Sequence, residues 1–200
     1  MGQSQVKERG RPREFDTDSA LDQAMLVFRN RGYHAATIGD LSTAMGLTSG
    51  SIYKAFKDKR NLFIQVFARY LSQRSAALQA RLAPFASGRE RIAEWLRFYL
   101  ESAADLEGQR GCLVVGSTVE SQALDEELAG LARQAVMRNR AFIGEMIREG
   151  QRDGSIAAGI DPALTADLLL CLTLGMRVMG KVTEIRDGNA AIAQIMKLLD

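Results

Sequence analysis

The 200-residue sequence predicts an all-α fold, for three reasons. Apolar residues recur at spacings of three and four along most of the chain, which is the period of an amphipathic helix. The chain has only three prolines, and its β-branched residues rarely occur in runs. Glycines, hydroxyl residues and acidic residues stand where successive helices would end and begin. These features predict a small three-helix head at the N-terminus and a larger helical bundle behind it.

The charge of the chain is small but unevenly placed. The whole sequence has a net charge of +2, and 46% of its residues are hydrophobic, which is ordinary for a globular protein. Residues 1–60 contain ten Lys or Arg and seven Asp or Glu, so this segment is net positive and the remainder is close to neutral. A positive head on a near-neutral body is consistent with a partner that carries phosphates.

Several function classes have little support in the sequence. No segment has the run of about 18 apolar residues typical of a membrane span, and the polar N-terminus is no signal peptide, so we expect a cytoplasmic protein. The two cysteines, Cys112 and Cys171, are expected to be reduced there. His34 is the only histidine, and no cluster has metal-ligand spacing. We therefore expect no metal and no cofactor.

A helix-turn-helix pattern occupies residues 37–60. Thr37 and Asp40 have the spacing of a capping box at the start of a short helix over 38–45, in which the apolar residues share one face. Gly46 follows, where a left-handed residue is expected to end that helix. A second short helix comes next, and such a unit places its second helix in the major groove of DNA.

The second helix would turn small polar side chains and positive charge toward solvent. Ile52, Ala55 and Phe56 are expected on its inward face. Lys59, in the first turn of the following helix, opposes the helix dipole, so a phosphate would give it a partner. The residues expected to contact DNA are Thr37, Thr48, Ser49, Gly50, Ser51, Tyr53, Lys54 and Lys59. The alternative is that these residues form an ordinary solvated helix face.

Three sequence blocks occur in order between residues 17 and 67. They read Ala20-Leu21-x-x-Ala24-Met25-x-x-Phe28-x-x-x-Gly32-Tyr33, Thr37-Ile38-x-x-Leu41-x-x-x-Met45-Gly46-Leu47 and Ser51-Ile52-Tyr53-x-x-Phe56-x-x-Lys59-x-x-Leu62-Phe63. In order and spacing they resemble the DNA-binding domain of the TetR family of bacterial transcriptional regulators. The resemblance implies a homodimer on a double-stranded DNA operator and a body that binds a small-molecule effector.

We divide the chain into three parts. Residues 1–15 are expected to be a disordered basic arm, whose Arg-Gly-Arg-Pro-Arg run either enters the minor groove or serves only as a solubilising tail. Residues 16–60 are expected to be the DNA-binding domain, and residues 61–200 the effector-binding and dimerisation domain. Beyond the two short helices of the pattern, helices are expected over residues 16–31, 59–82, 89–106, 112–120, 125–153, 163–182 and 189–199.

The helix expected over residues 163–182 is apolar on nearly all sides, which is unusual for a surface helix of a monomer. We expect one side to pack on the body and the other on a second subunit, with the last helix completing a four-helix dimer contact. The alternative is a central helix buried within one subunit.

The resemblance also implies an effector cavity among the helices of the body. Its expected lining is Trp95, Phe98, Tyr99, Cys112, Val115, Met137, Phe142 and Met146, with Phe67, Leu71, Val119 and Met176 as further candidates. Aromatic residues and methionines form an adaptable apolar wall, so we expect a mostly apolar effector. Glu120 and Arg140 are the best polar candidates. The alternative is that each of these residues is ordinary core.

The resemblance therefore implies a repressor that a small effector releases from a palindromic operator. Three other interpretations stay open. Cys112 could make the protein a redox sensor, although no neighbouring Lys, His or Cys in the sequence would lower its pKa. An enzyme would need a nucleophile–base pair or a phosphate loop, and the sequence contains neither. A DNA-binding architectural protein would have no effector and no cavity.

Overall fold

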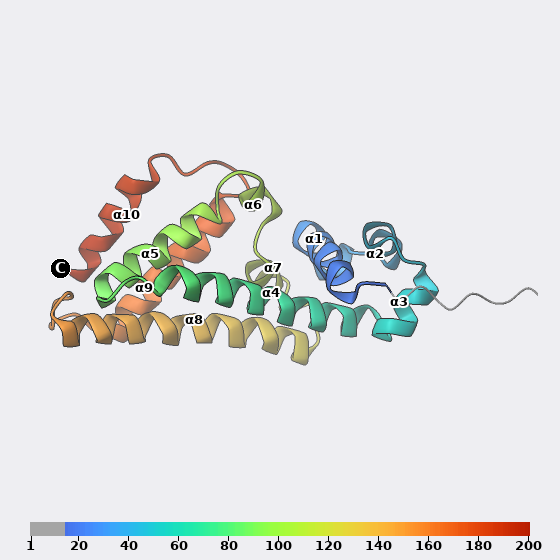
Figure 1. The fold of residues 1–200 in the computed structure, drawn as a ribbon, viewed down its shortest axis with the longest axis horizontal. Helices are drawn as coiled ribbons and strands as arrows, with labels where there is room; N and C mark the ends of the chain where they lie inside the picture. The colour runs from blue at the N-terminus through green and yellow to red at the C-terminus, as the bar shows by residue number, and fades with distance from the viewer. Residues whose placement is uncertain (1–14) are drawn as a thin grey trace, which may run out of the picture.

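The computed structural model describes residues 15–200, so the basic arm predicted for residues 1–15 lies, apart from Phe15, outside the described part. The described residues form ten α-helices and one 3₁₀ helix, without a strand among them, which confirms the all-α prediction (Figure 1). The helices are α1 Thr17–Ala35, α2 Ile38–Met45, α3 Ser49–Phe56, α4 Lys59–Leu82, α5 Gly88–Glu101, α6 Asp105–Arg110, α7 Leu113–Val119, α8 Glu126–Asp153, α9 Pro162–Met179 and α10 Gly188–Met196, followed by the 3₁₀ turn Lys197–Leu199.

The head consists of α1, α2 and α3, which sit against the first half of α4. The capping box at Thr37 is present: its hydroxyl accepts from the amide of Asp40 at 3.1 Å, and the Asp40 carboxylate accepts from the Thr37 amide at 3.0 Å. Gly46 ends α2 in the left-handed conformation at φ 64°, as the sequence predicts. Gly32 likewise interrupts α1, with φ 78° and ψ 174°.

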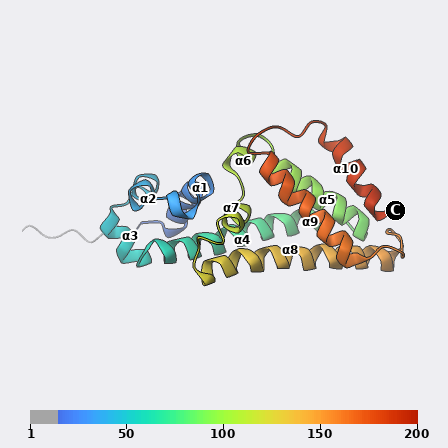
Figure 2. The same cartoon turned by 180° about the vertical axis from the view of Figure 1, so that it is seen from behind.

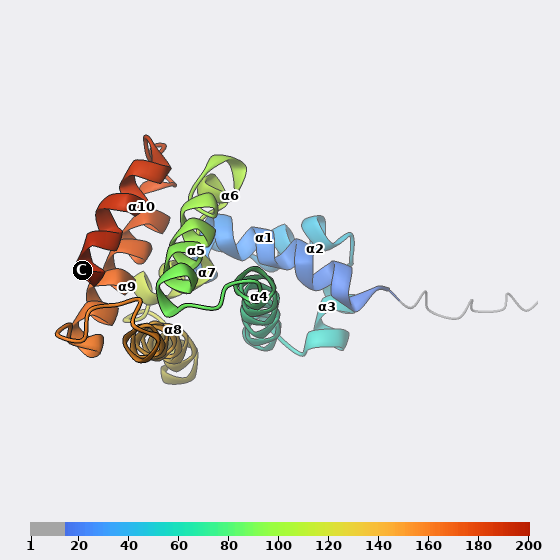
Figure 3. The ribbon, with the colours of Figure 1, turned by 60° about the vertical axis from the view of Figure 1, so that its left-hand side comes forward.

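The 24-residue helix α4 runs from the head into the body (Figure 1). It leaves the head and continues along the body beside α8, and the rear view gives the same arrangement (Figure 2). A view nearly along these two helices shows α5 above them, with α9 and α10 on the side away from α4 (Figure 3). α4 therefore belongs to both parts, and the predicted division at residues 60 and 61 remains a prediction.

The helix predicted over residues 89–106 is shorter than expected. α5 ends at Glu101, and the hydroxyl of Ser102 donates back to the carbonyl of Phe98 at 2.6 Å. The backbone of Ala103 then lies so close to two glycines that a Cβ on Gly108 or Gly180 would come within 2.3 or 2.1 Å of the Ala103 carbonyl oxygen. This close approach of three backbone segments is a tertiary contact that helical periodicity does not encode.

Helix α9 leaves apolar side chains facing solvent. Its exposed side chains are Leu164, Leu168, Leu172, Val178 and Met179. The helix is long and apolar enough to cross a membrane by length and composition alone, with a mean hydropathy of 1.4, and 39% of it is buried within the protomer. The sequence therefore predicts its apolar character correctly, and the face away from the body lacks a partner within the described residues.

Close contact between α5 and α8 depends on glycine at position 88. A Cβ there would come within 2.2 Å of the amide nitrogen of Gly150 and 2.4 Å of the carbonyl oxygen of Met146, and backbone atoms cannot move aside as side chains do. We expect Gly88→Ala to lower the free energy of unfolding by about 2 kcal/mol or more, measured by chemical denaturation at fixed protein concentration.

Gly130→Ala is the matched control, because Gly130 lies inside α8 with no atom within 4 Å of its added Cβ. This control should be neutral or stabilising by up to about 1 kcal/mol. Equal stability of the two variants would contradict the packing role of Gly88.

Candidate DNA-binding helix and effector cavity

Helix α3 presents a polar, solvent-exposed face at its N-terminal half. Thr48 caps the helix by accepting from the amide of Ser51 at 3.1 Å. Ile52 and Phe56 anchor the helix in the head core, while Tyr53 is half exposed and Lys54 is exposed. Ala55, expected on the inward face, is exposed instead, because the two buried residues alone fix the orientation of this short helix.

The predicted DNA-contacting residues gather on and around α3, with two exceptions. Ser49 and Gly50 are exposed beside the Thr48 cap, and Ser51 is half-buried there. Thr37, the first exception, lies at the start of α2, where its hydroxyl and amide are already engaged with Asp40.

Lys59, the second exception, contacts backbone carbonyls and an aromatic ring, whereas the sequence predicts a DNA phosphate as its partner. Its ammonium donates to the carbonyls of Tyr33 and Ala36 at 2.9 and 3.0 Å and lies 4.6 Å from the centre of the Tyr33 ring. These carbonyls belong to the end of α1, where the helix dipole favours a cation. A phosphate is therefore not needed to explain a lysine at this position.

The body contains a cavity of about 540 Å³. Its walls come from α4, α5, α7, α8 and α9, and exposed residues of α4 and α8 border it. Of the predicted lining residues, Tyr99, Cys112 and Phe142 line this cavity, as does Leu71.

The other predicted lining residues do not line the cavity, and these are Trp95, Phe98, Val115, Met137 and Met146, together with the further candidates Phe67, Val119 and Met176. Trp95 and Met146 are 0% and 1% exposed and belong to the body core, whereas Met137 is 51% exposed on the outside of α8. The two residues predicted as polar groups of the cavity have other partners. Glu120 accepts from the amide of Tyr33 at 3.1 Å, and Arg140 pairs with Asp167.

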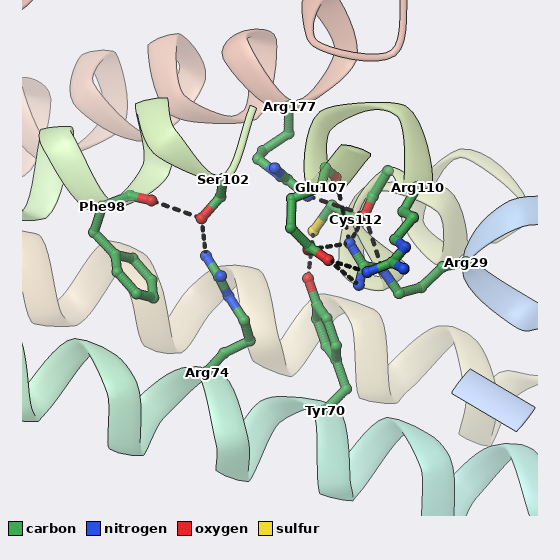
Figure 4. Close-up of polar contacts among 10 residues, drawn as sticks. Arg29, Tyr70, Arg74, Phe98, Ser102, Glu107, Arg110, Cys112 and Arg177 are labelled. Carbon is green, nitrogen blue, oxygen red and sulfur yellow. Dashed lines mark hydrogen bonds and ion pairs between the residues drawn. The ribbon is translucent and has the colours of Figure 1, made fainter. Parts of the chain in front are cut away.

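Sequence reasoning missed the charged part of the wall. Arg74, Arg138 and Arg177 line the cavity, and no Asp or Glu among residues 15–200 lines it. The guanidinium of Arg74 donates to the hydroxyl of Ser102 at 2.7 Å and lies 4.1 Å from the centre of the Phe98 ring (Figure 4). The wall is thus positive as well as apolar.

Two tyrosines and Cys112 add to the polar surface of the cavity, which also includes Ser72, Ser75, Gln79 and Asn139. Tyr70 donates its hydroxyl to the Cys112 sulfur at 3.4 Å (Figure 4). Burial raises the pKa of the Tyr70 hydroxyl, and so does the neighbouring Cys112. Burial also raises the pKa of Tyr99, while the positive charge of Arg74 opposes part of that rise. Both phenols are therefore neutral hydrogen-bonding groups at physiological pH.

One backbone carbonyl connects the cavity to the head. The carbonyl oxygen of Gly111 accepts from Nη2 of Arg177 at 2.9 Å and from Nη2 of Arg29, on α1, at 2.7 Å (Figure 4). Arg29 also pairs with Glu107 at 2.7 Å. A side chain in the wall of the cavity and a side chain of the head thus share one acceptor.

The Glu107 carboxylate stays ionised well into the acidic range. Burial by itself would raise its pKa, but hydrogen bonds from Arg29 and Arg110 outweigh that effect and hold the pKa at about 2. A carboxylate with a lowered pKa contributes stability above its unfolded value near 4.5 and loses it as the pH falls toward 2. The connection between α1 and α6 is therefore insensitive to pH in the physiological range.

Further contacts join the head to the body, in addition to those of Arg29. Arg60 pairs with Asp125 at 2.8 Å and also with Glu127. Gly32 packs directly on the Glu120 carboxylate. The apolar core of the head continues into α7 and α8 through Leu113, Val114 and Leu128. The head is therefore held against the body and does not hang from a flexible linker.

This architecture defines a class: helix-turn-helix DNA-binding proteins in which a helical body with a cavity is attached to the head. Residues 20–66 match the family described as "Bacterial regulatory proteins, tetR family", and residues 88–196 match "Tetracyclin repressor-like, C-terminal domain". The chain therefore belongs to the TetR family of bacterial transcriptional regulators. It is a helix-turn-helix regulator of transcription and not an enzyme.

Known relatives resemble the chain over nearly its whole length. An uncharacterised regulator of Bacillus subtilis, YezE, is 29% identical over 89% of this chain and 92% of its own. The Escherichia coli repressor ComR is 26% identical over 96% of this chain and 89% of its own. A cysteine mutant of the TetR-family regulator CifR, solved with a 26-base-pair operator DNA, is 32% identical, with a TM-score of 0.82 over 96% of this chain and all of that one.

Arg29 should hold the C-terminal part of α1 to the body. Its side chain is 6% exposed, so Arg29→Gln removes buried charge-assisted hydrogen bonds. We expect a loss of about 1–3 kcal/mol in stability and faster amide hydrogen exchange in α1 and in residues 105–112. Arg110→Gln is the control, because Arg110 pairs with the same carboxylate and forms no hydrogen bond or ion pair with the described residues of the head. If both variants exchange alike, Arg29 does not hold the two parts together.

Proposed function

We propose that this regulator is a repressor that binds a palindromic operator as a homodimer and leaves it when a small molecule occupies the cavity. The observation that carries the proposal is the exposed polar face of α3, with Thr48, Tyr53 and Lys54 turned to solvent while Ile52 and Phe56 hold the helix in place. Such a helix can enter the major groove with its N-terminal residues toward the bases. Because regulators of this family act on DNA, the protein would work in the cytoplasm.

Within the proposed interface the contacts divide by chemistry. Tyr53 and Lys54 can reach phosphates, and the small residues near the Thr48 cap allow close approach to base edges. Thr37 remains a candidate phosphate contact at the start of α2, and Lys59 would act indirectly by fixing the end of α1. Phosphate contacts would fix the position of the head on the duplex, and base contacts would supply sequence preference.

The exposed apolar face of α9 supports the predicted dimer through the last two helices. A contact between two copies of α9, completed by α10, would remove this face from water. Two-fold symmetry also suits two recognition helices about 34–36 Å apart, which read successive major grooves on one side of the duplex. A palindromic operator follows from the same symmetry.

The cavity supports control by a small molecule with an apolar part. Tyr99, Phe142 and Leu174 supply apolar surface, and α4, which forms one wall, also packs on the head. The dimer would have one form whose heads fit the operator and another whose heads are displaced. An effector that binds the displaced form more tightly would weaken operator binding. The size of the effect is the difference between the effector's binding free energies for the two forms, about 1–3 kcal/mol in ordinary cases. A tilt of α4 would change the separation of the two heads.

The DNA interface can be tested by selecting bound sequences from a random DNA pool at moderate salt. We expect an enriched palindrome, which Tyr53→Ala and Lys54→Ala should bind more weakly while remaining dimeric. Lys54→Ala should also reduce the salt dependence of binding, by about one released counterion for each lysine removed from a phosphate. Lys197→Ala, an exposed lysine at the far end of the chain, is the control. A pool that stays random would contradict sequence-specific binding.

The dimer contact can be tested at Leu168, which is 46% exposed near the middle of the apolar face. We expect Leu168→Asp to give monomers in sedimentation at micromolar concentration, because two carboxylates would be buried at the contact. Val119→Asp is the control, since Val119 is 78% exposed on α7 and lies outside that face. A Leu168→Asp protein that remains dimeric would exclude this face as the contact.

A further inference from the structure

The cavity has an unusual balance of charge. Three arginines line it from three different helices, Arg74 from α4, Arg138 from α8 and Arg177 from α9, and no carboxylate from the described part of the chain lines it. Positive charges that converge on a partly enclosed space repel one another, and this repulsion is stronger than in open water because the effective dielectric is lower. An anion between them would remove that repulsion.

Most other arginines of the described chain have a carboxylate partner, and these three do not. Within residues 15–200, twelve arginines form ion pairs with Asp or Glu. The five described arginines without such a pair are Arg74, Arg133, Arg138, Arg177 and Arg186. Three of these five therefore meet at one cavity.

Arg177 is the most informative of the three. It is only 3% exposed, and its Nη2 donates to the carbonyl of Gly111. Its Nη1 is buried with no hydrogen-bond partner among the described residues. A buried guanidinium with an unused donor is costly, because a charged group loses its hydration without replacement. Its place in the cavity wall indicates that an incoming acceptor is the missing partner.

We propose that the effector is an organic anion: an oxyanion group, such as a carboxylate or sulfonate, on an aromatic or aliphatic body. This inference rests on the proposed function, in which the cavity is the effector site. Arg177 and Arg74 bind the oxyanion, since guanidinium donors suit such groups in bidentate geometry. Arg138 lies exposed at the cavity and attracts the anion from solvent. Phe142 and Leu174 pack against its apolar part.

The same arginine offers a route from the cavity to the head. An anion that binds the unused Nη1 of Arg177 pulls on the guanidinium whose Nη2 donates to the Gly111 carbonyl, and that carbonyl also accepts from Arg29 of α1. A shift of Arg177 toward the anion therefore changes the attachment of the head at Gly111. By linkage, operator DNA and the anion weaken each other's binding by the same factor.

The test compares two fluorescent probes of similar shape that differ in charge. The anionic probe is 8-anilino-1-naphthalenesulfonate, and the neutral probe is N-phenyl-1-naphthylamine, which lacks the sulfonate. We expect the full-length protein to bind the anionic probe more tightly. Arg74→Gln and Arg177→Gln should each weaken its binding by about tenfold or more, because each removes a charge-assisted interaction. Binding of the neutral probe should change by less than about twofold.

Arg133→Gln is the matched control, because Arg133 is an exposed arginine of α8 without an ion pair that lies outside the cavity wall. Unfolding curves of each variant show whether it is folded, and the half-buried Arg74 gives a second variant if Arg177→Gln unfolds. Equal affinity of the two probes, no binding of the anionic probe, or unchanged affinity in both folded cavity variants would overturn the proposal.

The failure of this inference can be told apart from the failure of the proposed function. If the protein selects a palindrome but binds the anionic and the neutral probe equally well, the anionic effector is wrong and sequence-specific operator binding is supported. If the anionic probe binds through Arg74 and Arg177 but does not release the selected DNA, anion binding in the cavity is supported. Control of operator binding through this cavity is then wrong.

Discussion

In the proposed mechanism, the carbonyl oxygen of Gly111 is the atom that the head and the cavity wall share. It accepts from Arg29 of the head and from Arg177 of the cavity wall. Gly111 has φ 76° and ψ −174°, a conformation that residues with a Cβ rarely adopt. A Cβ at this position would also come within 2.6 Å of the Lys181 side chain. Glycine is thus required for the chain to present this carbonyl to both arginines.

A shared acceptor transmits a change only if its surroundings are stiff. The head core continues into α7 and α8, and Glu120 holds the Tyr33 amide at the kink of α1. The pair between Arg60 and Asp125 is more exposed and contributes less, because solvent screens it. The buried apolar core and the contacts near Gly111 therefore contribute more to the attachment of the head than this exposed ion pair does.

The sequence predicts local features well because caps, glycine stops and apolar periodicity are local signals. Thr37, Gly46 and the apolar character of α9 are as expected. The cavity is less predictable, because its lining is a tertiary property. Trp95 and Met146 have the same helical periodicity whether they face core or cavity. Nothing in the sequence around Arg177 shows that this charge in a largely apolar helix turns inward.

Helix α9 has two different faces. One face holds Arg177 and Leu174 at the cavity, and the other exposes Leu168 and Leu172, where we propose that a second subunit packs. Because a helix is stiff along its length, it cannot rotate at Arg177 without moving the outer face. An effector that draws Arg177 inward would therefore act on the head through Gly111 and on the dimer through α9. In the proposed dimer both movements would change the distance between the two α3 helices, and this distance must match the spacing of successive major grooves in the operator.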